Sequence, residues 1–310
     1  MSKKWLTILK VSVACAAFAF IVFRIMQQIE KGVELRITDF KTLPMIAAVA
    51  LMPVNYLMES FKWKHLLAKI QDVKLLFAVK SVLAGLAASM VTPNRIGDFA
   101  GRIMLLKVCN RAAGTMASVV GSCAQLLVIA AFGVAAFVCN IELPRQLHYF
   151  QDNYFVTLIT LVIILIVAII LFFNISKMAA KIKIERSLML KNFVEAMGLY
   201  RARQLAAVLA ISAVRYAVFA IQFYLVLWSF GVEMGLLTGL CVIAFIYCFV
   251  TIVPTFALAE WGVRGSAALF FLSPFGGSAV AILSATIAVW LINIGLPALA
   301  GAVVMLKSSN

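Results

Sequence analysis

The sequence predicts an all-α polytopic membrane protein built from two inverted repeats, with about six full spans and two re-entrant hairpins that are broken at proline. Three observations lead to this fold class. Hydrophobic residues make up 65% of the 310 residues and charged residues only 13%, whereas soluble domains are roughly half apolar and a quarter charged. Apolar runs long enough to cross a bilayer recur along the chain. Two shorter apolar runs end at Pro93 and Pro254, at comparable points of the two halves.

Six apolar segments approach or exceed the roughly 20 residues that a transmembrane helix requires. The first begins near the N-terminus, behind Lys3 and Lys4, and resembles a signal peptide. It is long enough to span, and further spans follow, so we expect a first transmembrane helix rather than a cleaved signal. The six predicted spans are 5–23, 43–61, 112–138, 154–173, 205–230 and 278–305.

The segments 75–107 and 236–272 each contain an apolar leg, a proline, a short polar stretch and a second apolar piece. Lys and Arg accumulate on the cytoplasmic side of membrane proteins, so their distribution discriminates between topologies. If both segments are re-entrant hairpins, 19 of the 27 Lys and Arg residues lie inside and 6 outside; with eight ordinary spans the numbers are 16 and 9. The distribution favours the hairpins, and eight spans with two proline kinks is the alternative.

The re-entrant topology places an odd number of spans in each half, so the halves have opposite orientation. We expect one integral membrane domain over 1–310, with inverted halves of about 1–140 and 150–310. The basic loop 174–204 lies within the second half and is either an interfacial cytoplasmic helix or a plain linker. Both termini are then cytoplasmic, and a bacterial inner (plasma) membrane is the expected location. Inverted repeats with broken helices at matching positions are a recurrent transporter architecture.

Composition argues against several other classes of protein. The net charge of +15 comes mostly from residues in short loops between apolar runs, which suits membrane topology and anionic headgroups rather than nucleic acid. Six cysteines show no CxxC spacing and there are two histidines, so we predict no metal site. No cofactor motif, no ATP-binding glycine loop and no catalytic constellation occurs. The oligomeric state is not predicted by the sequence.

The two broken segments share a pattern of proline, acid and arginine. In the first, Pro93 is followed by Asp98, and Arg102 comes four residues later; in the second, Pro254 is followed by Glu260 and then Arg264. Proline ends a helical leg because it lacks a backbone donor. An acid and an arginine four residues apart lie on one helical face and are able to pair. We expect the breaks at Pro93, Gly97, Pro254 and Gly262.

Charges at membrane depth are expensive, so they face the protein interior and mark functional sites. Arginines at the hairpins suit a phosphate, which a guanidinium binds bidentately. Arg215 lies deep in the span 205–230, and we expect it to face Glu59, Glu260 or Asp98. The candidate substrate-binding or gating residues are Arg95, Asp98, Arg102, Glu260, Arg264, Arg215 and Glu59. The alternative is that these charges only lock the hairpins in place.

Other polar residues in the spans have simpler interpretations. Lys62 either pairs with Glu59 or, with Trp63 and Lys64, anchors the second span at the interface, and we favour the anchor. The spans 112–138 and 278–305 carry no charge, and we expect them to act as scaffold, with a kink near Asn293, Gly295 and Pro297 in the second.

The segments around Pro93 and Pro254, together with Glu59-Ser60-Phe61-Lys62-Trp63, resemble the flippase-like membrane domain of the bacterial lysylphosphatidylglycerol synthases. The first family motif has a Pro-x-x-x-Gly-Glu core followed by Arg, and Asp98 replaces the usual Glu here. The second has Gly-Val-Arg followed by an acid, and Gly265 stands at the acid's position, which Glu260 is able to fill.

The resemblance implies translocation of phospholipid rather than its synthesis, and we expect no aminoacyltransferase domain in this chain. The leading hypothesis is a flippase that moves a phospholipid or lipid-linked anionic substrate, with membrane lipids and their anionic headgroups as partners. The alternatives are an integral-membrane enzyme acting on a lipid phosphate or lipid-linked sugar, and a non-transporting membrane scaffold.

Overall fold

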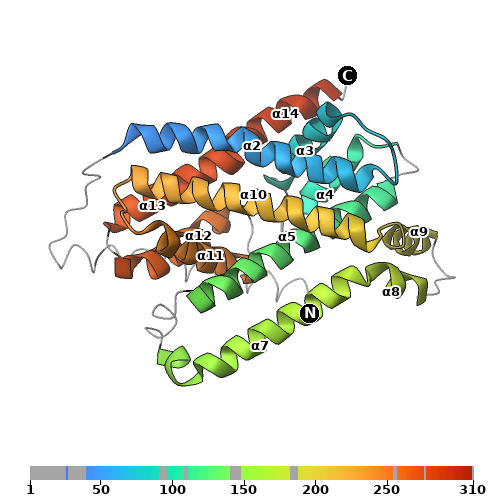
Figure 1. Ribbon diagram of the computed structural model, residues 1–310. Coiled ribbons are helices and arrows are strands. Elements are labelled where there is room, and N and C mark those ends of the chain that lie inside the picture. The colour runs from blue at the N-terminus through green and yellow to red at the C-terminus, as the bar shows by residue number, and fades with distance from the viewer. Residues whose placement is uncertain are drawn as a thin grey trace.

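A computed structural model describes residues 26, 40–90, 92, 96–107, 111–139, 148–181, 188–253, 257–275 and 277–308 (Figure 1). The chain is an all-α polytopic membrane protein, as predicted. Five helices are long and apolar enough to cross a membrane: Thr42–Leu67, Arg111–Cys139, Asn153–Phe173, Ala202–Ser229 and Ala279–Leu306. They correspond to five of the six predicted spans; the sixth, 5–23, lies outside the described residues.

The helices follow one another in the same order in both halves. The first half contains α2 (Thr42–Leu67), α3 (Leu75–Met90), α4 (Ile96–Met104) and α5 (Arg111–Cys139). The second half contains α7 (His148–Phe173), the short helices α8 (Ile175–Lys181) and α9 (Leu188–Met197), and then α10 (Ala202–Ser229), α11 (Leu236–Ile252), α12 (Ala257–Leu272), the 3-10 turn η3 (Ser273–Phe275), α13 (Ala279–Trp290), the π-helix η4 (Leu291–Gly295) and α14 (Leu296–Ser308). The series α2 to α5 therefore has its counterpart in α10 to α14.

The helices α2 and α10 pack side by side and run antiparallel to one another (Figure 1). At one end, the Lys41 N–H group donates to the Ser229 carbonyl at 2.9 Å. At the other, the Tyr200 hydroxyl donates to the Leu66 carbonyl at 3.2 Å. Burial raises the pKa of the Tyr200 phenol, so it remains a neutral donor. This second end is called the basic end below, because it carries the exposed cations Lys69, Lys74, Lys107, Arg111, Lys177, Lys181, Lys191, Arg201 and Arg203.

The pair α3 and α4 forms a re-entrant hairpin that opens at the basic end. Val73, just before α3, and Leu106, just after α4, belong to the same buried cluster as Leu66. Both legs therefore start and finish at one end of the bundle. The legs approach closely, since a Cβ atom at Gly97 would lie 2.2 Å from the Ala88 carbonyl oxygen. Only glycine permits such contact between two backbones.

The pair α11 and α12 forms the second hairpin, which opens at the opposite end. Val232, before α11, packs in one cluster with Leu272 and with Ala279, the first residue of α13. Figure 1 shows the two hairpins at opposite ends of the α2–α10 pair. The hairpins, and not the alternative of eight spans, are what the described residues form.

The packing of the hairpins reveals the relationship between the halves. The first leg α3 packs against α14, the last span of the other half, while α11 packs against α5, the last span of the first half. The first leg of each hairpin thus packs against the last span of the other half. This exchange is what an approximate two-fold axis lying between antiparallel α2 and α10 produces.

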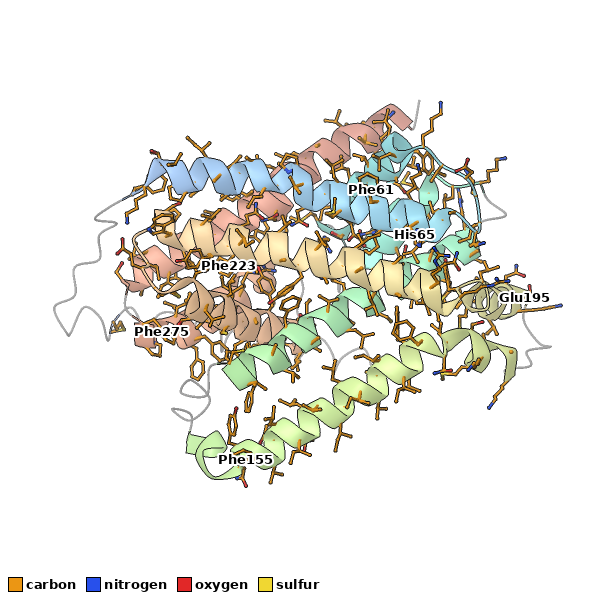
Figure 2. All side chains as sticks on the ribbon, in the orientation of Figure 1. Phe61, His65, Phe155, Glu195, Phe223 and Phe275 are labelled. Carbon is orange, nitrogen blue, oxygen red and sulfur yellow. The ribbon has the colours of Figure 1, made fainter. Side chains whose placement is uncertain are left out.

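The outer helix α7 runs beside α5 at the edge of the bundle (Figure 1). Apolar side chains project from it along most of its length, including Phe155, which is 69% exposed (Figure 2). The buried side chains, by contrast, gather around α10, where Phe223 is fully covered. An apolar outer surface of this kind suits lipid chains.

Candidate functional site

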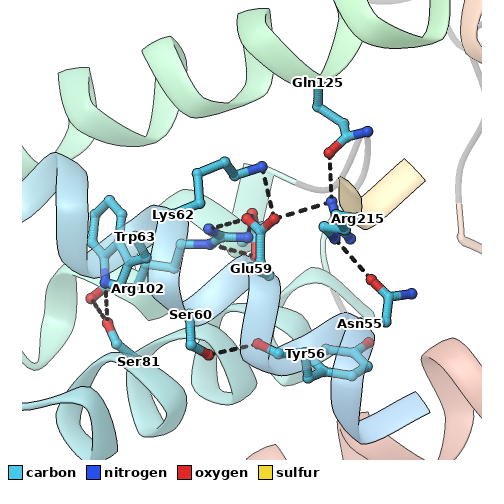
Figure 3. A network of polar contacts seen from close by, with 11 residues as sticks. Asn55, Tyr56, Glu59, Ser60, Lys62, Trp63, Ser81, Arg102, Gln125 and Arg215 are labelled. Carbon is cyan, nitrogen blue, oxygen red and sulfur yellow. Dashed lines mark hydrogen bonds and ion pairs between the residues drawn. The ribbon is translucent and has the colours of Figure 1, made fainter. Parts of the chain in front are cut away.

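The carboxylate of Glu59 is the centre of a charge cluster inside the bundle (Figure 3). Glu59 lies two turns before the end of α2, and its side chain is 7% exposed. Three cations surround it: Lys62 Nζ at 2.7 Å, Arg102 Nη1 at 2.8 Å and Arg215 Nη1 at 3.0 Å. These cations come from α2, α4 and α10. The cluster therefore ties the first hairpin to the central helix pair.

Arg102 is fully engaged by carboxylates. Its Nε donates to Asp98 Oδ1 at 3.0 Å and its Nη2 lies 3.0 Å from Asp98 Oδ2, which gives a bidentate pair one turn apart on α4. Its third nitrogen, Nη1, donates to Glu59. The guanidinium also lies 5.8 Å from the Trp63 ring centroid. Because all three nitrogens of Arg102 are used, this residue locks the hairpin and offers little to a further anion.

Arg215 is engaged differently. It lies 13 residues into the 28-residue α10, roughly 20 Å from the helix start at 1.5 Å per residue, and hence near the middle of this span. Its Nε donates to Asn55 Oδ1 at 2.9 Å and its Nη1 donates to Gln125 Oε1 at 3.0 Å. Among the described residues Nη2 has no partner, and the side chain is 29% exposed. Arg215 thus keeps one donor nitrogen free among the described residues, on a side chain that is partly exposed.

The described charges of the cluster do not balance. Three cations, Lys62, Arg102 and Arg215, face two carboxylates, Glu59 and Asp98. One unit of positive charge remains in a region where an uncompensated charge is costly. The two most exposed side chains are those of Asp98, at 24%, and Arg215, at 29%. The surplus charge and the access to it coincide at Arg215.

A chain of side-chain amides extends from Arg215 across the bundle. Asn55 Nδ2 donates to Asn293 Oδ1 at 3.2 Å, and Asn293 Nδ2 donates to Gln222 Oε1 at 2.9 Å. Gln222 Nε2 then donates to the Ala48 carbonyl at 2.8 Å. All three amides are at most 7% exposed. A satisfied buried network of this kind fixes the positions of its members.

The π-helix of the last span is part of the same network. Pro297 has no N–H group, so the carbonyl four residues earlier, that of Asn293, lacks its α-helical donor. The Tyr56 hydroxyl donates to this carbonyl instead. The π-helix lies where the sequence predicts a kink near Asn293, Gly295 and Pro297, and a side chain on α2 satisfies the freed backbone group, as lipid surroundings require.

The second hairpin carries its own buried arginine. Arg264 in α12 is 7% exposed, and its Nη1 donates to the Tyr247 hydroxyl on α11 at 3.2 Å. The guanidinium carbon lies 5.5 Å from the Tyr247 ring centroid. Arg264 thus lies against the other leg of its hairpin, as Arg102 does in the first half.

Several predicted site residues are brought together and others remain predictions. The local pair Asp98–Arg102 and the approach of Arg215 to Glu59 are present as predicted. The positions Arg95, Pro93 and Pro254 and the side chain of Glu260 lie outside the described residues, and their roles stay predictions. Gly262 is buried within α12 rather than at its start.

One prediction made from the sequence was wrong, and another was incomplete. Lys62 was expected to anchor α2 at the interface, but its side chain is 3% exposed and pairs with Glu59. The last spans of both halves were expected to be scaffold, yet Gln125 and Asn293 from these spans join the network around Arg215. The sequence marks both residues as amides within uncharged apolar runs. In lipid surroundings such an amide must find a hydrogen-bond partner within the protein.

Comparison with known proteins identifies the family but no individual relative. No curated protein matches the chain significantly. A family model described as the lysylphosphatidylglycerol synthase TM region matches residues 7–301, which is nearly the whole chain and includes both hairpins and the charge cluster. The chain therefore belongs to the lysylphosphatidylglycerol synthase transmembrane-region family.

Proposed function

We propose that the protein is a lipid flippase that moves a phospholipid or lipid-linked anionic substrate across the bacterial inner membrane, with the anionic headgroup bound at Arg215. The observation that carries this proposal is the surplus positive charge of the described cluster inside the bundle, together with the free donor nitrogen on the partly exposed Arg215 side chain. An anion is the guest that such a site stabilises most, since it supplies the missing countercharge.

The guanidinium of Arg215 suits a phosphate group in particular. Nε and Nη1 are occupied by the side-chain oxygens of Asn55 and Gln125, which hold the plane of the guanidinium in place. A phosphate oxygen approaching Nη2 meets a preoriented donor, so little side-chain entropy is lost on binding. Asp98, the other exposed member of the cluster, would face a cationic or hydroxyl part of the same headgroup.

The arrangement of the hairpins suggests a path across the bilayer. The first hairpin opens at the basic end and the second at the opposite end, and each is packed on the last span of the other half. Rocking of one half against the other would expose the site near Arg215 first to one side and then to the other. Family membership supports a lipid as the cargo, because the family is that of a lipid-modifying synthase's membrane region.

The positive-inside rule orients the protein. We propose that the basic end faces the cytoplasm, since its exposed Lys and Arg residues come from the loops before α3, before α5 and around α8 and α9. The last helix α14 then ends in the cytoplasm. With a first span at 5–23, the N-terminus is cytoplasmic as well.

Transport of a fluorescent phosphatidylglycerol between the leaflets of proteoliposomes tests the proposal. The native chain is compared with Arg215→Gln and with Arg203→Gln, which removes an exposed arginine at the basic end. We expect native protein and Arg203→Gln to move the lipid at similar rates and Arg215→Gln to be at least about tenfold slower, the loss expected when one charge-assisted hydrogen bond is removed. Equal rates in all three proteins would contradict the proposal.

Chemical analysis of the lipid after the assay distinguishes the rival functions. Recovery of intact lipid in the opposite leaflet supports a flippase. A modified or hydrolysed lipid would indicate an enzyme, and an unmoved, intact lipid across a panel of anionic headgroups would leave the scaffold as the better interpretation.

A further inference from the structure

The ammonium group of Lys62 is the most deeply buried cation of the cluster. Its side chain is 3% exposed, and Glu59 Oε2, at 2.7 Å, is its partner. The side chain passes Gly121 of α5, where an added Cβ atom would lie 3.7 Å from Lys62 Cε. The other two N–H bonds of the ammonium have no partner among the described residues. A buried ammonium normally satisfies more of its donors than this.

The charged and titratable groups around Lys62 come from its own helix and from α4, α5 and α10. Glu59 and, one turn further on, His65 lie on its own helix; Asp98 and Arg102 come from α4 and Arg215 from α10. The helix α5 presents Gly121, two residues before the Cys123 thiol. Lys62 therefore contacts one carboxylate, that of Glu59. The guanidinium groups of Arg102 and Arg215 bind this same carboxylate, and Arg102 also binds Asp98.

Only one of the three cations is able to change its charge. A guanidinium keeps its proton in proteins, whereas a buried lysine loses its proton readily. Protonating Glu59 would leave three cations around a neutral group, and protonating Asp98 would weaken both of its contacts to Arg102. Deprotonating Lys62, by contrast, removes the surplus charge and leaves two guanidinium groups facing two carboxylates.

We propose that Lys62 is a proton-binding site coupled to the anion site, so that an anionic headgroup binds at Arg215 together with a proton on Lys62. The inference rests on the proposed function. The empty site exchanges the Lys62 proton with water, and the surplus charge is absent while Lys62 is a neutral amine; when the headgroup binds to that form, the nitrogen lone pair takes a proton from water and forms an N–H bond. Release of the lipid reverses this step. No electron transfer is involved, and one lipid moves with one proton.

Two buried hydroxyls on the helices that face the cluster fit this role. Ser118 lies one turn before Gly121 on α5, and Ser212 lies one turn before Tyr216 on α10, next to the turn that carries Arg215. Both hydroxyl oxygens are buried and have no hydrogen-bond partner among the described residues. Unpaired hydroxyls in a protein interior are costly unless they serve water or a proton path.

The direction of the pH effect follows from the charges. The protonated cluster has one positive charge to offer an anion and the deprotonated cluster has none, so affinity is higher at low pH. Linkage requires that a ligand preferring the protonated form draws in a proton when it binds. At pH values above the point where Lys62 loses its proton, the affinity for the anionic headgroup should fall by up to about tenfold per pH unit. This is the limit for one linked proton.

Calorimetric titration of the full chain in detergent with short-chain phosphatidylglycerol measures this uptake. Titrations in two buffers of different ionisation enthalpy, from about pH 6 to about pH 10, give the protons taken up per lipid bound across the range between ordinary His and Lys titration. The phosphodiester of this probe does not titrate there. The variants are Lys62→Arg and Lys62→Met, with His65→Gln and Cys123→Ala as controls for the neighbouring groups.

Native protein, His65→Gln and Cys123→Ala should take up protons on binding and lose affinity as pH rises. Lys62→Arg should bind with neither proton uptake nor pH dependence, and Lys62→Met should bind weakly at every pH without uptake. The Met variant carries the test if the larger Arg side chain prevents folding. Binding by native protein without proton uptake, or uptake that persists in both Lys62 variants, overturns the proton coupling alone. Absence of binding at every pH overturns the anion site itself, and with it this inference.

Discussion

The Nε–H group of Arg215 donates a 2.9 Å hydrogen bond to Oδ1 of Asn55, and Asn55 in turn donates through Nδ2 to Asn293. One amide on α2 thus connects the accessible arginine on α10 to the π-helix of the last span. The last span continues as α14, which packs against the first hairpin, where a Cβ atom at Gly301 would lie 2.0 Å from the Leu83 carbonyl oxygen. The anion site and the hairpin are therefore linked by a short series of contacts.

Replacing Asn55 by Leu should reduce both stability and anion binding. It leaves Arg215 Nε and Asn293 Oδ1 without their Asn55 partner, and each unsatisfied buried group costs about 1–3 kcal/mol. Thermal unfolding in detergent and phosphatidylglycerol binding measure the two effects. Val54→Leu, at a neighbouring exposed position of α2, is the matched control and should change neither. Native binding by Asn55→Leu would show that Arg215 does not depend on this amide.

Replacing Glu59 by Gln should destabilise the fold strongly. Three cations would then share the single carboxylate of Asp98, and breaking a buried ion pair from one side costs about 3–5 kcal/mol. The measurement is the midpoint of unfolding in a denaturing detergent series. Glu195→Gln is the control, because its 4.0 Å pair with Lys191 is solvent-exposed and contributes little. Similar losses in the two variants would contradict the account of the cluster.

Replacing Gly97 by Ala should open the first hairpin. The added Cβ atom would lie 2.2 Å from the Ala88 carbonyl oxygen, which belongs to backbone and cannot rotate away. Overpacking of this kind costs about 1–3 kcal/mol or more. Proteolysis of the purified protein and lipid transport should both respond. Gly235→Ala is the control and should behave as native, because the nearest atom to the added Cβ would be 3.9 Å away. Native stability and transport in Gly97→Ala would mean that the two legs are less tightly packed.

Tyr56 and Pro297 should show coupled effects on stability. Tyr56→Phe removes the donor to the Asn293 carbonyl, at a cost of about 1–3 kcal/mol for an unpaired buried acceptor. Pro297→Ala restores a backbone N–H for that carbonyl. In the double variant the loss caused by Tyr56→Phe should therefore shrink, which a double-mutant cycle on unfolding free energies measures. If the losses in unfolding free energy were strictly additive, Tyr56 and Pro297 would not be coupled.

The extent to which the sequence predicts the molecule differs between fold and site. Hydropathy and the bias of Lys and Arg predict the spans and both hairpins, because lipid forces every span to be apolar and helical. Charged residues are also easily recognised within apolar segments. The structure brings together four of them: Glu59, Asp98, Arg102 and Arg215.

The neutral partners were not predictable in the same way. Gln125 and Asn293 are single amides in otherwise apolar spans, and helical periodicity does not reveal which neighbouring helix an amide faces. Lys62 was misassigned because its neighbours Trp63 and Lys64 form an interfacial pattern. Its burial depends on α5 covering it with Gly121, a contact between segments distant in the sequence.

The central claim is that an anionic lipid headgroup binds at Arg215 inside the bundle. Photo-crosslinking with a phosphatidylglycerol that carries its reactive group on the headgroup, followed by peptide mass spectrometry, tests it most directly. The account predicts crosslinks to α10 around Arg215 and to α4 around Asp98, and their loss in Arg215→Gln. Crosslinks confined to the exposed cations of the basic end, and unchanged in Arg215→Gln, would contradict it.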